Sequence, residues 1–252
     1  MNPPINFRSN IPLFYDKSKT EFRLDPYERY DEIVIRQIAL HLTDELWGGY
    51  PFQEVLNFIL ENLKESENLK IADLGCGVGR LIGELATRFP QTDCWGIDYS
   101  YQMLQQAHRF WLSQQSLYLD RTERGFPIVQ IKGHQLENLQ FGLAKAESLP
   151  FDDNSLDLIC HSFLLDRLDN PIQSLQEQFR VLKKGGQLIF VSPLNFQKKE
   201  HWQKLYPPDN LKNLLTELGF VIKKNKTIKL QEQLDAHGNF IEWKCESFVL
   251  EK

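Results

Sequence analysis

The alternation of short apolar strands with amphipathic helices constrains the fold of this chain most. From Leu69 onward, helical patterns separate strands predicted near residues 69–74, 94–98, 139–144, 156–160 and 187–191. Strands that alternate with helices of this length form βαβ crossovers, which build a mainly parallel sheet covered on both faces. Two further strands are predicted near residues 220–226 and 241–250. The pattern therefore predicts an α/β fold.

Two regions depart from this alternation. Four prolines interrupt residues 1–28, which we expect to be irregular, and two helical patterns follow over residues 35–46 and 52–63. We therefore expect residues 1–68 to form a helical cap and residues 69–252 to form one sheet domain. The connection between residues 119 and 139 is longer than the usual ~2–6 residues, so it holds either an extra strand or hairpin or a loop over the site.

The composition excludes several classes of protein. The 252 residues carry a net charge of −5, which disfavours broad binding of nucleic acid. No stretch approaches the ~18 apolar residues of a membrane span, and the first residues lack the features of a signal peptide. The four cysteines are widely spaced and form no CxxC pair. We expect a cytoplasmic protein without a disulfide framework or a bound metal.

The glycine-rich stretch from Asp73 to Arg80, with the sequence DLGCGVGR, is the first informative motif. Glycine permits a tight turn and a close approach of the backbone to a ligand. The spacing is not the GxGxxG of dinucleotide-binding proteins, because Arg80 stands where the third glycine would be. A purely structural turn is the simpler alternative. Asp98 favours a ligand, since a carboxylate about 20 residues after the first glycine can accept hydrogen bonds from ribose hydroxyls.

Four blocks of sequence resemble class I S-adenosylmethionine-dependent methyltransferases, and most closely their type 11, small-molecule branch. The blocks cover residues 73–79, 97–98, 146–159 and 179–186, in the order of that family. The resemblance implies a Rossmann-like fold with a seven-stranded, mainly parallel sheet whose last two strands form an antiparallel hairpin. It also implies S-adenosylmethionine as the cofactor and S-adenosylhomocysteine as the product.

The resemblance further implies which residues contact the cofactor. The glycine turn would lie along the methionine portion of the cofactor, with Asp73 near the ammonium group of that portion. Asp98 would hold the ribose. Residues 99 and 103 would pack beside the adenine, and residues 146 and 147 would meet its edge. The predicted cofactor-binding residues are Asp73, Gly75, Cys76, Gly77, Gly79, Asp98, Tyr99, Met103, Ala146, Glu147 and Ser162.

One position departs from the pattern of the family. An acidic residue usually precedes the alanine of Ala146-Glu147 and accepts a hydrogen bond from the adenine amino group. This chain has Lys145 there, and a lysine side chain offers only donors. The anchoring of adenine must therefore be rearranged, with Glu147 as the candidate, or be weaker.

The residues that would serve the chemistry lie in the segments after the fourth and fifth predicted strands. Methyl transfer depends mainly on positioning, and a general base is needed only if the acceptor is protonated. The candidate catalytic residues are His161, Asp166 and His201. Each has a simpler alternative: His161 as a strand-end histidine satisfied by its neighbours, Asp166 in a local ion pair with Arg167, and His201 in an exposed loop.

Rival functions remain open. A nucleic-acid or protein-glutamine methyltransferase would normally show Asn/Asp-Pro-Pro-Tyr/Phe after the fourth strand, where residues 161–164 read HSFL, so we expect a small-molecule acceptor. A non-catalytic methyltransferase-like binding protein is supported by Lys145 and opposed by Asp98. A nicotinamide oxidoreductase is disfavoured by Arg80. The sequence identifies neither the acceptor nor the methylated atom, and it leaves monomer and homodimer open.

Overall fold

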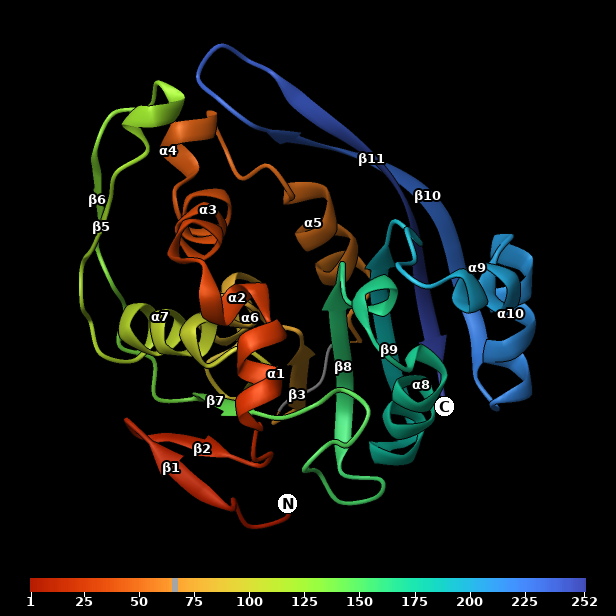
Figure 1. The fold of residues 1–252 in the computed structure, drawn as a ribbon. Helices are drawn as coiled ribbons and strands as arrows, with labels where there is room; N and C mark the ends of the chain where they lie inside the picture. The colour runs from red at the N-terminus through yellow and green to blue at the C-terminus, as the bar shows by residue number, and fades with distance from the viewer. Residues whose placement is uncertain (65–67) are drawn as a thin grey trace.

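A computed structural model describes residues 1–64 and 68–252, which contain a mixed β-sheet of nine strands (Figure 1). Its strands are β1 (Asn6–Arg8), β2 (Ile11–Leu13), β3 (Lys70–Leu74), β4 (Asp93–Asp98), β7 (Leu139–Leu143), β8 (Leu156–Ser162), β9 (Leu182–Ser192), β10 (Val221–Gln233) and β11 (Phe240–Glu251). They lie in the order β1-β2-β7-β4-β3-β8-β9-β11-β10. The predicted cap, residues 1–68, includes residues 65–67, which lie outside the described residues.

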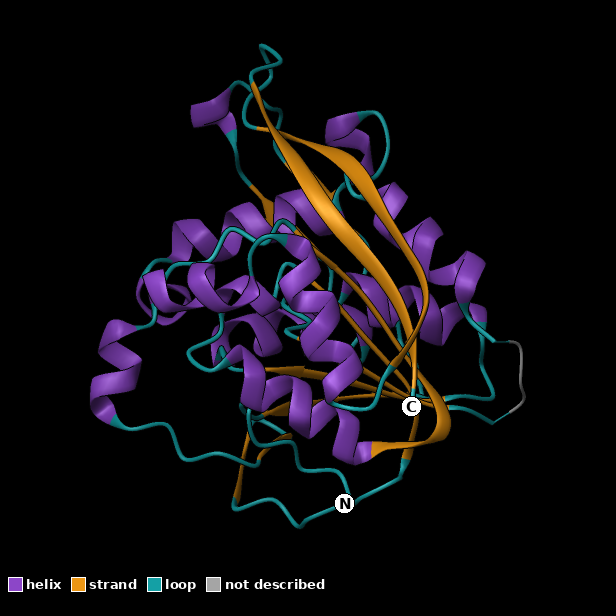
Figure 2. Ribbon diagram, turned by 90° about the vertical axis from the view of Figure 1, so that its right-hand side faces the viewer, coloured by secondary structure: helices purple, strands orange, loops and turns teal. Residues whose placement is uncertain are grey.

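Helices cover both faces of this sheet (Figure 2). They are α1 (Lys19–Leu24), α2 (Pro26–Arg29), α3 (Asp31–Leu42), α4 (Asp44–Trp47), α5 (Gln53–Asn62), α6 (Arg80–Arg88), α7 (Tyr101–Trp111), α8 (Pro171–Val181), α9 (Lys199–Leu205) and α10 (Pro208–Glu217). Apolar side chains of α3, α5, α6 and α7 form one core cluster with the sheet, and those of α8, α9 and α10 form a second. No helix among the described residues has the length and apolar character that crossing a membrane requires.

The central strands run in the predicted Rossmann-like order. Strands β7, β4, β3, β8 and β9 are parallel, and β11 lies antiparallel between β9 and β10. The expected mainly parallel sheet with an antiparallel terminal hairpin is thereby confirmed over the seven strands β7, β4, β3, β8, β9, β11 and β10, whereas the expected total of seven strands is too low because β1 and β2 extend the sheet beyond β7. The chain runs outward from β3 through β4 to β7 and then returns to β8 on the other side of β3. Ligands of open α/β sheets bind at such a reversal, outside the carboxyl ends of the strands.

The expectation that residues 1–28 are irregular is wrong. They contain β1, β2, α1 and α2, and β2 joins the sheet by pairing in parallel with β7. Ser9 and Asn10 turn the β1–β2 hairpin with positive φ values of 47° and 66°. Pro12 is tolerated because β2 meets β7 at only one residue pair. Short strands of this kind leave no apolar alternation long enough to read from a sequence.

Two connections also differ from simple loops. The segment between α7 and β7 holds a separate hairpin of β5 (Leu117–Leu119) and β6 (Val129–Ile131). Strand β6 lies between residues 119 and 139, which confirms the first of the two alternatives, an extra strand or hairpin. The segment after β9, predicted as a loop, contains α9. Helix α10 begins at Pro208 after Pro207.

The β10–β11 hairpin extends beyond the sheet and curves toward α4 in Figure 1. Near its far end, Glu232 forms an ion pair with Arg36 of α3 and accepts a hydrogen bond from Trp243 Nε1 at 2.9 Å. The hairpin therefore covers the N-terminal helices from above the carboxyl edge of the sheet.

The packing of α6 against α7 depends on a glycine. Trp111 of α7 is 3% exposed, and its Nε1 donates to the carbonyl oxygen of Val78 at 3.0 Å. A Cβ atom added to Gly83 of α6 would lie only 2.4 Å from Cε2 of this indole ring. The buried ring is held on both sides, so it has little freedom to move away.

We therefore expect Gly83→Ala to destabilise the protein, although alanine favours a helix more than glycine does. The clash with Trp111 should lower the free energy of unfolding by about 1–3 kcal/mol, the usual cost of overpacking a core. Urea unfolding followed by tryptophan fluorescence measures the change. Arg88→Ala, at an exposed position of the same helix, is the control and should stay within about 0.5 kcal/mol of the wild type. Equal or greater stability of Gly83→Ala would contradict this account.

Candidate cofactor site

Two acidic residues mark the carboxyl ends of adjacent strands. Asp73 of β3 is 3% exposed, and burial together with the charge of Asp98 raises its pKa well above the ordinary value. Burial also raises the pKa of Asp98, at the end of β4, to about 6. Within the described residues, neither carboxylate forms an ion pair with a lysine or arginine. Two neighbouring acidic side chains, one buried and one partly buried, that lack an ion pair favour a positively charged ligand at this edge.

The glycine turn is fastened to the end of β4 by hydrogen bonds. The Gly77 N–H donates to Oδ2 of Asp98 at 2.7 Å, and the Ser100 N–H donates to its Oδ1 at 2.8 Å. The N–H groups of Gly75 and Cys76 both donate to the carbonyl oxygen of residue 97, at 2.7 and 3.1 Å. The turn, the strand end and the start of α7 therefore form one unit.

One glycine of this turn faces open space. Gly77 has a φ of 55°, and a Cβ added there would meet no atom within 4 Å. At Gly75, by contrast, an added Cβ would lie 2.8 Å from Cδ1 of Leu164. The backbone at Gly77 can therefore be approached closely by a ligand, whereas Gly75 is required for packing.

Arg80, which stands where a dinucleotide-binding motif would have its third glycine, has a structural role. Arg80 donates to Oδ1 and Oδ2 of Asp44 at 2.7 and 3.0 Å and forms a second ion pair with Glu84 at 3.0 Å. It also donates to the carbonyl oxygen of His41 at 3.1 Å. Arg80 thus joins the start of α6 to α3 and α4, directly after the left-handed Gly79 that precedes the helix.

A segment from the N-terminal region is fixed onto the same edge. The Lys17 side chain, 1% exposed, donates to Asp25 Oδ2 at 2.6 Å, to Glu28 Oε1 at 3.2 Å and to the carbonyl oxygen of Tyr99 at 3.2 Å. Glu28 Oε1 also accepts from the first N–H of α7, that of Tyr101, at 2.6 Å. Sequence reasoning missed these contacts, because nothing local marks a bond between residues 28 and 101.

A second set of N-terminal residues meets the loop after β7. Lys145 Nζ donates to Oε1 of Glu21 at 2.8 Å, and the Tyr15 hydroxyl donates to the same oxygen at 2.7 Å. Nearby, Tyr27 of α2 is 39% exposed, and desolvation together with the charge of Asp98 raises its pKa. Tyr15 and Tyr27 of the N-terminal region therefore lie near the ends of β7 and β4.

The other predicted cofactor residues are divided between this edge and the interior. Tyr99 and Ser162 lie at the ends of β4 and β8, beside the glycine turn. Met103 is 3% exposed and belongs to the core under α7. Glu147 accepts a hydrogen bond from the backbone N–H of residue 170 at 3.2 Å, so its carboxylate is directed toward the start of α8. Ala146 is buried, as is the Cys76 thiol, whose pKa burial raises well above the ordinary value.

The three candidate catalytic residues are not brought together. His161 is fully buried and stacks on Phe190, with 4.9 Å between ring centroids, and burial lowers its pKa to about 3. Asp166 is 1% exposed and accepts from the hydroxyl of Ser192 at 2.9 Å. His201 lies in α9, where it is 7% exposed. No hydrogen bond or ion pair in the described part of the chain joins any of the three to Asp73 or Asp98.

The side-chain alternation of β8 explains the position of His161. Successive side chains of a strand point to opposite faces of a sheet. Cys160 belongs to the core cluster under α6 and α7, so His161 points to the face covered by α8. Asp73 follows Ala72, which faces α8, and Asp73 therefore points to the other face. The histidine and the buried carboxylate lie on opposite faces of the sheet.

Three aromatic residues form a wall beyond the end of β8. Phe163 has a φ of 55°, which is uncommon for a bulky residue and often accompanies functional sites. Its N–H donates to the carbonyl oxygen of Val191 at 2.9 Å. Its ring stacks on Phe52 at 5.2 Å and meets Trp243 edge-on at 5.6 Å. We call Phe52, Phe163 and Trp243 the aromatic wall.

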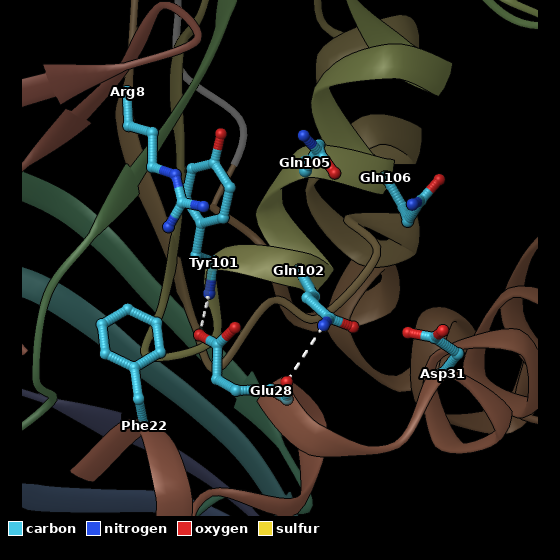
Figure 3. Close-up of a pocket in the computed structure, with 8 residues that line it drawn as sticks. All are labelled: Arg8, Phe22, Glu28, Asp31, Tyr101, Gln102, Gln105 and Gln106. Atoms are coloured by element: carbon cyan, nitrogen blue, oxygen red, sulfur yellow. Dashed lines mark hydrogen bonds between the residues drawn. The ribbon is translucent and has the colours of Figure 1, made fainter. Parts of the chain in front are cut away.

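A cavity of about 380 Å³ lies on the outer side of α7 (Figure 3). Glu28 stands at its border, where its backbone carbonyl oxygen accepts from Gln102 Nε2 at 3.0 Å and its carboxylate accepts from the Tyr101 N–H. Its lining residues are Arg8, Phe22, Glu28, Asp31, Tyr101, Gln102, Gln105 and Gln106. None of them belongs to the glycine turn, so this cavity is separate from the edge that carries Asp73 and Asp98.

Comparisons with known proteins identify the central part of the chain. A family model described as a methyltransferase domain matches residues 72–190. Residues 72–190 form a methyltransferase domain. The solved structure of a SAM-dependent methyltransferase from Methanosarcina mazei is similar in fold, with a TM-score of 0.53 and 22% identity over 77% of this chain and 96% of that one. The predicted family and fold are confirmed, and with them S-adenosylmethionine as the cofactor of that family.

Curated proteins that resemble this chain are distant. A ubiquinone/menaquinone biosynthesis C-methyltransferase, UbiE, from Campylobacter jejuni is 26% identical over 187 residues, which are 73% of this chain and 68% of the relative. A malonyl-[acyl-carrier protein] O-methyltransferase from Marinomonas is 29% identical over 140 residues, 55% of this chain and 44% of that protein. Lys17, Glu21 and Glu28 lie outside the residues that match the family model.

The raised pKa of Asp98 makes the stability of the ligand-free protein depend on pH. The folded chain binds this proton more tightly than the unfolded chain, so stability is lost as the pH rises through the unfolded value of 3.8 toward the folded value of about 6. Between pH 4 and pH 7, Asp98→Asn should therefore gain about 1–3 kcal/mol of stability relative to the wild type. Urea unfolding of both proteins at the two pH values measures the gain, and an unchanged difference would contradict it.

Proposed function

We propose that this protein transfers a methyl group from S-adenosylmethionine to a small-molecule acceptor. The observation that carries the proposal is the pair of Asp73, buried, and Asp98, partly buried, at adjacent strand ends beside the open backbone at Gly77. Within the described residues neither carboxylate forms an ion pair, and S-adenosylmethionine would place its ammonium and sulfonium charges beside them. It has no phosphate, which agrees with a glycine turn that no lysine follows.

Each group at the edge then has a defined task. The carboxylate of Asp73 would attract the ammonium group, and Asp98 would accept hydrogen bonds from the ribose hydroxyls while it keeps the Gly77 and Ser100 N–H groups. The backbone at Gly77 would lie along the methionine portion. When bound, the cofactor supplies a methyl group that its sulfonium has already activated. The protein contributes by orienting the two reactants and by excluding water.

The acceptor would lie on the side of the aromatic wall. The wall follows the end of β8, next to the glycine turn, because Leu164 packs on Gly75 directly after Phe163. Flat apolar side chains favour an acceptor with a planar apolar portion. The relative from Campylobacter jejuni, whose name describes a C-methyltransferase of ubiquinone and menaquinone biosynthesis, supports a small-molecule acceptor of this kind.

No general base is needed for an acceptor that is nucleophilic without losing a proton. Where a base is needed, Asp166 is the residue we assign from the three predicted candidates. It lies three residues after Phe163, burial raises its pKa, and its Oδ2 lies 3.5 Å from Arg167 Nε without a hydrogen bond in the described part of the chain. His161 is not assigned, because its ring is enclosed against Phe190 on the other face of the sheet.

Binding of S-adenosylhomocysteine, measured by calorimetry, tests the proposal. Asp98→Ala should weaken binding at least about tenfold, or about 1.4 kcal/mol, because the ribose and the Gly77 N–H both lose their acceptor. Asp93→Ala is the matched control: Asp93 begins the same strand, is partly exposed and pairs only weakly with Lys70, at 3.5 Å. This control should bind as the wild type does.

Two results would contradict the proposal. Failure of the wild type to bind S-adenosylhomocysteine at millimolar concentration would favour the non-catalytic alternative. Equal affinity of Asp98→Ala and wild type would remove Asp98 from the ribose site.

A further inference from the structure

The order of the strands predicts where the base of the cofactor would lie. Strand β4 stands between β3 and β7, and all three are parallel. The inference rests on the proposed function, which puts the methionine portion at the end of β3 and the ribose at the end of β4. The base then continues in the same direction, to the end of β7. This strand ends at Leu143 and is followed directly by Ala144 and Lys145.

The polar groups at the end of β7 come from both the sheet domain and the N-terminal segment. Lys145 Nζ and the Tyr15 hydroxyl both donate to Oε1 of Glu21, at 2.8 and 2.7 Å. Among the described residues, Oε2 of Glu21 accepts from the backbone N–H of Ser18 alone, at 2.9 Å, in the capping box of α1. A carboxylate has about four acceptor positions, so Glu21 retains capacity for a further donor.

Aromatic rings flank this ion pair. The Lys145 ammonium lies 4.3 Å from the ring centroid of Tyr15 and 5.3 Å from that of Tyr99. The two ring centroids are 5.9 Å apart. The Lys145 and Glu21 side chains are 33% and 28% exposed, so both remain within reach of a ligand. The strand end thus presents one donor and one acceptor beside two flat apolar surfaces.

We propose that Glu21 and Lys145 together recognise the adenine base. Adenine carries its 6-amino donor beside the acceptor N1. Glu21 would accept from the amino group, and Lys145 would donate to N1. The Glu21 carboxylate is ionised, because the hydrogen bonds from Lys145 and Tyr15 hold its pKa well below the ordinary value. The hydrogen-bond acceptor for the amino group, which Lys145 cannot provide, would therefore come from Glu21. This residue belongs to the N-terminal segment, outside residues 72–190, which match the family model.

The competing candidate, Glu147, is already engaged. Its carboxylate accepts from the backbone N–H of Asn170, and its carbonyl oxygen accepts from Gln173 Nε2 at 3.0 Å. Both bonds orient it toward the start of α8. Strand β8 lies on the far side of β3 from β7, and α8 follows β8 in the chain. Glu21, by contrast, is bonded to the residue that directly follows the β7 strand end.

Calorimetry with two ligands tests this inference. S-inosylhomocysteine differs from S-adenosylhomocysteine only in the base, where a carbonyl oxygen replaces the amino group and the adjacent ring nitrogen carries a hydrogen. Both changes oppose the Glu21–Lys145 pair, so the wild type should bind the adenosyl ligand at least about tenfold more tightly. Glu21→Gln should reduce this preference to about threefold or less, since an amide offers both a donor and an acceptor.

Two further variants control the result. Glu32→Gln neutralises an exposed carboxylate in the first turn of α3 and should keep the full preference. Lys145→Met retains most of the side-chain volume and should also lower the preference, because only adenine offers the ring-nitrogen acceptor that Lys145 would use. Lys145→Met provides the test if Glu21→Gln fails to give the cooperative thermal unfolding of the wild type.

The outcomes separate this inference from the proposed function. If the wild type binds neither ligand, the proposed function fails. If the wild type binds both ligands equally, or if Glu21→Gln retains the full preference, recognition of the base by Glu21 and Lys145 is overturned while the proposed function stands.

Discussion

The two hydrogen bonds accepted by Asp98 hold the functional edge of this protein together. One carboxylate oxygen takes the N–H of Gly77 and the other takes that of Ser100, so the glycine turn is fixed to the end of β4 and the start of α7. Loss of this carboxylate would leave two backbone donors without partners, which is costly away from water. The same carboxylate lies near a buried acid, Asp73, and their repulsion helps to raise the pKa of Asp73.

The central strands and the glycine turn could be predicted from the sequence, because local patterns of residues encode them. The strands around Asp73 and Asp98 are short apolar runs, and the glycine turn has a fixed spacing relative to Asp98. The position of His161 could also have been deduced, since the alternation of β8 sends residues 160 and 161 to opposite faces. The bond between Glu28 and the start of α7 could not, because two polar residues more than seventy positions apart leave no periodic or local signature.

The residues outside the matched domain determine how the common scaffold is completed. The glycine turn and Asp98 belong to residues 72–190, whereas Lys17 precedes α1, and Glu21 and Glu28 come from short helices that a single sequence scarcely reveals. A fold of this type hosts many reactions, and the segments that differ between relatives carry the specificity. Here Lys145 offers only hydrogen-bond donors and the ionised Glu21 only acceptors, so the bonded pair presents both kinds of group.

The position of β10 at the end of the sheet has a consequence for the behaviour of the protein in concentrated solution. A thirteen-residue strand with one unpaired side is a template for intermolecular β-pairing. Lysines 223, 224, 226 and 229 are exposed along this strand. Two copies brought edge to edge would bring these charges together, so the repulsion discourages aggregation. At the opposite end, β1 has only three residues and offers little backbone for another chain to join.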